Sequence, residues 1–120
     1  MERAIRRLRL EGALDDRRTA SIYARRAALV KHRGPQRAVH EIEATGIEST
    51  VARSVVSEVY AEVEVDTIIR HALHRRLTGR IQNRTQFRRL YQYLVRQGFD
   101  SSKTIEVLRS HSMAGAMDHK

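Results

Sequence analysis

A pattern of apolar and glycine positions occurs twice in the chain, 52 residues apart. In each copy, three apolar residues at helical spacing precede a glycine and one more apolar residue: Ala38, Val39, Ile42, Gly46 and Ile47, then Leu90, Tyr91, Leu94, Gly98 and Phe99. This spacing marks one face of an amphipathic helix, and a glycine just past it typically ends the helix in a left-handed conformation. Each copy therefore predicts a helix, a tight turn and a second helix, and the recurrence predicts stacked helical units.

The same periodicity predicts helices along almost the whole chain. In the opening segment we expect one helix that ends at Gly12 and a second helix capped by Asp15 or Asp16. Gly34 breaks the chain before Pro35, a residue that suits the first position of a helix. After the junction at Gly12, the expected helices cover about residues 16–32, 35–45, 48–62, 63–80, 84–97 and 101–110.

These elements predict an all-α fold of tandem three-helix repeats, stacked into an elongated, curved module without a single central core. Residues 1–14 are interpreted as the last helix of a truncated first repeat. Residues 15–62 and 63–111 then form a second and a third three-helix repeat. Residues 112–120 lack clear periodicity and are expected to be a flexible tail.

Composition narrows the class of protein. The chain has 120 residues, of which 41% are hydrophobic, and it contains no cysteine, so it has neither disulfides nor a thiolate site. No apolar run approaches the roughly 20 residues of a membrane span, and the arginine-rich start is unlike a secretory signal. We therefore expect a cytoplasmic protein that does not enter the membrane.

Charge is distributed in blocks along the chain, which carries a net charge of +9. Residues 17–40 hold seven basic residues and no acid, residues 41–66 hold seven acids and one arginine, and residues 67–99 hold eight arginines and no acid. Recurring basic blocks favour a polyanionic partner, nucleic acid first. From charge and helical phase, the candidate contacts are Arg25, Arg26, Lys31, Arg33, Arg37, Arg70, Arg75, Arg76, Arg80, Arg84, Arg88 and Arg89.

The sequence gives little indication of a metal site or a catalytic site. His71 and His74 lie three positions apart, but no acid or cysteine lies near them in sequence to complete a metal site. The chain has no glycine-rich phosphate loop and no serine in a nucleophile elbow, so we expect a protein without catalysis, metal or cofactor. Tyr91 has the phase of the core, whereas Tyr93 is the more exposed of the two and could stack on a base.

An ordered set of residues resembles the RecX family, bacterial regulators of RecA. The set covers residues 4 to about 110 and comprises Leu14-Asp15-Asp16, Ala20, Gly34, Glu41-Ile42, Gly46-Ile47 and Arg96-Gln97-Gly98-Phe99-Asp100. Thr19 departs from the aromatic residue usual in the family before the alanine, and two helices of the family's first repeat are missing. The resemblance implies tandem three-helix repeats and a non-enzymatic protein that binds the groove of the RecA–DNA filament.

Such a protein hinders strand exchange, ATP turnover and the co-protease role of RecA in the SOS response. Its expected partners are the RecA nucleoprotein filament and, weakly and without sequence preference, DNA; we expect a monomer. The alternative is a stand-alone helix-turn-helix DNA-binding protein, whose helix–turn–helix signature is similar. The second helix of the first pair argues against it, because Arg53 is its one basic residue among Glu48, Glu58 and Glu62. A purely structural helical adaptor would leave the basic blocks unexplained.

Overall fold

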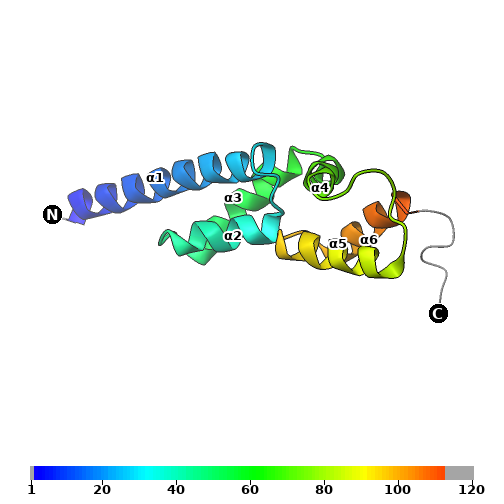
Figure 1. The fold of residues 1–120 in the computed structure, drawn as a ribbon. Coiled ribbons are helices and arrows are strands. Elements are labelled where there is room, and N and C mark those ends of the chain that lie inside the picture. The colour runs from blue at the N-terminus through cyan, green and yellow to red at the C-terminus, as the bar shows by residue number, and fades with distance from the viewer. Residues whose placement is uncertain (1, 113–120) are drawn as a thin grey trace.

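The computed structural model describes residues 2–112, which form six helices (Figure 1). Within this part of the chain, the one β feature is an isolated parallel bridge between Ile81 and Ser112. The predicted all-α class is confirmed. The helices are α1 Glu2–Leu29, α2 Pro35–Ala44, α3 Ser49–Ala61, α4 Val65–His74, α5 Arg84–Arg96 and α6 Ser101–Ser110.

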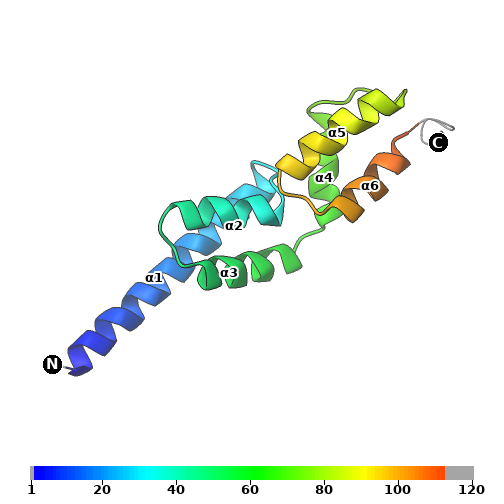
Figure 2. The same cartoon turned by 90° about the horizontal axis from the view of Figure 1, so that it is seen from below.

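The molecule is elongated, as predicted. Its radius of gyration is 18.3 Å, whereas a compact domain of this length has about 13–14 Å. Helices α1, α2 and α3 pack on one another and form the N-terminal unit, and α4, α5 and α6 form the C-terminal unit. Figures 1 and 2 show the two units end to end, with the first half of α1 extending beyond α2 and α3. The boundaries of the proposed repeats stay a prediction.

Both predicted glycine turns are present. Gly46 and Gly98 each have φ of +100°, a backbone conformation that glycine adopts without strain. Ile47 and Phe99, which follow them, are both buried. The recurrence in the sequence therefore corresponds to a repeated local structure, α2–turn–α3 and α5–turn–α6.

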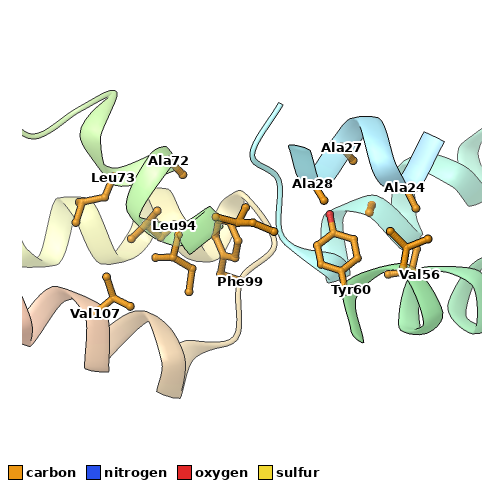
Figure 3. Close-up of a cluster of buried hydrophobic side chains, with 14 of the residues drawn as sticks. Ala24, Ala27, Ala28, Val56, Tyr60, Ala72, Leu73, Leu94, Phe99 and Val107 are labelled. Carbon is orange, nitrogen blue, oxygen red and sulfur yellow. The ribbon is translucent and has the colours of Figure 1, made fainter. Parts of the chain in front are cut away.

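The buried apolar side chains form one connected cluster that runs along the molecule rather than a central core. In Figure 3, Ala24, Ala27 and Ala28 of α1 lie beside Val56 and Tyr60 of α3. The same view shows the C-terminal unit burying larger residues: Leu73, Leu94, Phe99 and Val107. Half of the twelve buried apolar residues of the N-terminal unit are alanines, which let α1 approach α2 and α3 closely.

The predicted break at Gly12 is wrong, because α1 is one continuous helix of 28 residues. A glycine inside a helix costs only about 1 kcal/mol relative to alanine. Gly12 does not adopt positive φ, and Leu14 is 55% exposed instead of packing against a turn. Residues 1–14 are therefore not a separate helix, and their descent from a preceding repeat stays a prediction.

Two helix ends also differ from the prediction. The N–H of Arg33 donates to the carbonyl of Ala27 over 2.8 Å, and His32 has φ of +53°. This bond spans six positions, one more than the six-to-one bond of a Schellman motif, and as in that motif its donor follows a left-handed residue. It closes α1 before Gly34 and leaves Val30 exposed. Helix α4 ends at His74, not near residue 80, and the loop after it is anchored by buried Leu77.

Ser112, the first residue of the predicted tail, is bonded to the helical part of the chain. The N–H of Ile81 donates to the carbonyl of His111 over 2.9 Å, and the hydroxyl of Ser112 donates to the carbonyl of Leu108 over 2.8 Å. Ser112 is thus part of the C-terminal unit. The remaining predicted tail, 113–120, lies outside the described residues.

Candidate functional site

Two of the candidate arginines are held inside the N-terminal unit. Nη1 of Arg33 lies 3.1 Å and Nε of Arg37 3.4 Å from Oε2 of Glu41, and all three side chains are largely shielded from solvent. The hydroxyl of Tyr60 donates to the carbonyl of Arg33 over 2.8 Å. Arg33 and Arg37 are therefore occupied in stabilising the packing of α2 against its neighbours.

Tyrosines complete this network. Burial raises the pKa of Tyr60, and the Glu41 carboxylate raises it further while Arg33 opposes that effect. The pKa of Tyr23 is also raised, first by burial and then by the neighbouring Glu41 carboxylate. Both hydroxyls therefore stay protonated at neutral pH. Lys31 places Nζ 5.5 Å from the centroid of the Tyr23 ring, a cation–π contact.

Three other candidates contact the chain while remaining exposed. Arg75 donates to the carbonyl oxygens of Val30 and Lys31, over 3.3 and 3.4 Å, and so binds the carboxyl end of α1. The guanidinium of Arg76 lies 4.2 Å from the centroid of the Tyr93 ring. Arg80 donates to the carbonyl of Ser112 over 3.1 Å. Reversing the charge of Arg75 or Arg76 would therefore disturb packing as well as surface charge.

The remaining six candidates are exposed, and their side chains have no hydrogen bond or ion pair with any other described residue: Arg25, Arg26, Arg70, Arg84, Arg88 and Arg89. Three of these six lie on α5, which contains no acid. Unpaired guanidinium groups in water keep all their donors available for a phosphate or a carboxylate. Of all the helices, α5 is therefore the best candidate for the predicted contact with a polyanionic partner.

Two hollows adjoin this helix. Arg84 and Arg88 line one of about 260 Å³ together with Phe87, Tyr91 and Ile105. Tyr91 is half-buried at this rim, so the expectation that it belongs to the core is only partly right; Phe87 fills the buried position beside it. Tyr93 is half-buried too, because Arg76 covers its ring.

Arg96 was missing from the predicted contacts. It lines the second hollow, of about 450 Å³ between α2 and α5, together with Arg37 and His40. Its helical phase, seven residues after Arg89, could have signalled a place on the basic face of α5. The sequence could not predict that Arg96 lies close to Arg37. The two residues are far apart in the chain and come together only where the N-terminal and C-terminal units meet.

That joint is an interlock of two glycines. The N–H of Gly34 donates to the carbonyl of Gln97 over 2.7 Å, and the N–H of Gln36 donates to the carbonyl of Gly98 over 3.2 Å. A Cβ on Gly34 would lie 2.1 Å from the carbonyl carbon of Gly98, and one on Gly98 would lie 2.4 Å from the nitrogen of Arg37. Only two residues without side chains permit this approach.

Histidines flank the same joint. The rings of His32 and His71 stack with centroids 4.7 Å apart, and Arg75 lies 3.0 Å from Nδ1 of His32. Burial lowers the pKa of His32, and the charges of Arg75 and His71 lower it further. No group of three or more histidines and carboxylates within residues 2–112 is arranged to hold a metal ion. Nor does any helix in that range have the length and apolar character needed to cross a membrane.

Helix α3 lacks a basic, base-reading face. Its single arginine, Arg53, is exposed, and Glu58 on the same helix binds Arg17 of α1 over 2.9 Å. This argues against the helix-turn-helix alternative for the first helix pair. Comparison with known protein families, curated proteins and solved structures finds no match.

Proposed function

We propose that the protein is a RecX-like, non-catalytic modulator that binds the RecA–DNA filament and mainly inhibits the recombinase, ATPase and co-protease activities of RecA in the cytoplasm. Two features support the proposal. The residues that resemble the RecX family lie in order along nearly the whole chain. The elongated all-helical body, with two three-helix units end to end, matches the architecture that this resemblance implies.

The observation that carries the proposal is the basic face of α5. Arg84, Arg88 and Arg89 are exposed and unpaired on a helix without acids. The planar guanidinium binds phosphate or carboxylate with two parallel hydrogen bonds. A filament groove presents DNA phosphates and acidic protein side chains together, and this face suits both.

The same charges predict the behaviour towards DNA alone. Binding that rests on a few exposed arginines releases few counterions, so it is weak, insensitive to sequence and reduced by salt. Inhibition of RecA should also fall as salt rises, because exposed charges are screened beyond roughly 8–10 Å. Sequence-specific binding to bare duplex would instead favour the helix-turn-helix alternative.

A charge-reversal pair of variants tests the proposal. The first variant changes Arg84, Arg88 and Arg89 to Glu. The control changes the exposed, unpaired residues Arg18, Arg53 and Arg109 to Glu, with the same change in net charge. We expect the α5 variant to lose most suppression of DNA-dependent ATP hydrolysis by RecA, and the control to keep it. Circular dichroism should show equal helicity for both.

Three outcomes would contradict the proposal. If both variants lose inhibition equally, net charge and not the α5 face is responsible. If the folded α5 variant inhibits like the parent chain, α5 is not the contact. If the parent chain leaves RecA unaffected and binds the RecA–DNA filament no better than bare DNA, the assignment of function is wrong.

A further inference from the structure

Among residues 2–112, nothing packs against the first half of α1. Figures 1 and 2 show it extending past α2 and α3. The first of its charged residues with an ion pair in the described part of the chain is Arg17, which binds Glu58 of α3. Before it, Ile5, Leu8, Leu10 and Leu14 are between 46% and 68% exposed. These are half of the large apolar side chains that residues 2–112 expose. Such a concentration of apolar surface marks an interaction site.

Charge is segregated along this segment. Residues 2–10 contain four arginines and Glu2, whereas residues 11–16 contain Glu11, Asp15, Asp16 and no basic residue. Two adjacent stretches of one helix thus carry net charges of +3 and −3. A polyanion such as DNA would be attracted by the first stretch and repelled by the second, so nucleic acid is a poor match for the whole segment.

We propose that this segment pairs with the same segment of a second copy of the chain, with the two helices antiparallel. A twofold axis near Arg9 sets Arg3 of one helix level with Asp15 of the other, and Arg7 level with Glu11. Each copy makes both contacts, as a twofold interface requires. A parallel pair would instead set like charges level with one another. The proposal replaces the expectation of a monomer and is independent of the function proposed above.

The geometry also limits the strength of the pairing. Fifteen helical residues span about 22 Å. Two such segments bury less surface than the roughly 1,200–2,000 Å² of stable protein complexes. The apolar side chains supply the attraction, and the charges fix the direction and the register. The dimer is therefore weak, depends on protein concentration and is further weakened by salt.

Sedimentation equilibrium of the full chain over a range of concentrations tests the pairing. We expect the apparent mass to rise with concentration from the 13.9 kDa of one chain towards twice that value. One variant changes Arg3 and Arg7 to Glu, so that positions 3, 7, 11 and 15 all carry acids. The other changes Glu11 and Asp15 to Arg, so that the same four positions all carry basic residues. Each alone should be monomeric, and an equimolar mixture should form a heterodimer tighter than the parent dimer.

The mixing experiment separates this arrangement from others. A parent chain that stays monomeric at all concentrations would overturn the proposal. Self-association of either variant as strong as that of the parent would overturn the antiparallel register. A further variant, with Leu10 and Leu14 changed to Gln, keeps the charges and helix propensity but should dissociate the dimer. Dimerisation that survives this change would place the interface elsewhere.

Discussion

The two three-helix units carry similar basic blocks but use their arginines differently. In the N-terminal unit, Glu41 lies between Arg33 and Arg37 and binds both. In the C-terminal unit, no acid occurs between residues 67 and 99. The arginines there donate to backbone carbonyls, pack on a tyrosine ring or point into solvent. One carboxylate thus holds Arg33 and Arg37 in the fold, whereas Arg25 and Arg26 of the same basic block stay exposed.

The largest predicted effect concerns the two glycines that occupy equivalent places in the units. Gly98→Ala should cost well over 2 kcal/mol, because it combines positive φ with a Cβ 2.4 Å from the Arg37 backbone. Gly46→Ala has the same φ but no atom within 4 Å of the new Cβ, so it should cost only about 1–2 kcal/mol. Urea unfolding of both variants measures the difference. Equal losses would mean that the interlock does not contribute to stability.

A second prediction removes the carboxylate that distinguishes the units. Glu41→Gln leaves the positive charges of Arg33 and Arg37 without their shared counterion in a largely shielded place. We expect a loss of about 1–3 kcal/mol in the free energy of unfolding, typical of hydrogen bonds to charged groups. The control, Glu106→Gln on the exposed face of α6, should stay within about 0.5 kcal/mol of the parent chain. If the two variants are equally stable, the network around Glu41 is only a surface feature.

The smallest predicted effect is a pH dependence at the joint between the units. The pKa of His32 is lowered in the folded chain from its usual 6.5, so the unfolded chain binds the proton more readily. Stability from this residue is therefore complete above about pH 6.5 and decreases as pH falls through that value towards the folded pKa. His32→Asn, which tolerates positive φ, should show a shallower loss of melting temperature between pH 7 and pH 5. Parallel curves for the parent and the variant would contradict the prediction.

Local chemistry made the helix class and the glycine turns predictable from the sequence. Apolar spacing and the glycines at 46 and 98 act within one helical turn, where sequence and structure are closely linked. The continuous α1 was not predicted, because the small cost of Gly12 in a helix is offset when no tertiary contact stabilises a turn there. The joint was not predictable either, since Gly34 and Gly98 meet across 64 positions.

The candidate contact residues likewise divide into those predictable from local sequence and those that depend on tertiary contacts. Exposure of Arg84, Arg88 and Arg89 follows from the phase of α5, and it was predicted. The contacts of Arg75 with the end of α1 and of Arg80 with Ser112 depend on where carbonyl groups lie after folding. Neither charge nor periodicity carries that information. Arginine clusters in a sequence therefore give an upper limit on the residues available to a partner.

The glycine interlock has a consequence for the geometry of any longer array of such units. Because backbone atoms around Gly34 and Gly98 touch there, the angle between neighbouring units is fixed by main-chain contact and not by variable side chains. A fixed rotation and translation, applied again at each successive unit, generates a superhelix of constant pitch. The surface residues of such an array can change without altering that pitch. The shape of the array and the chemistry of its surface can therefore vary independently.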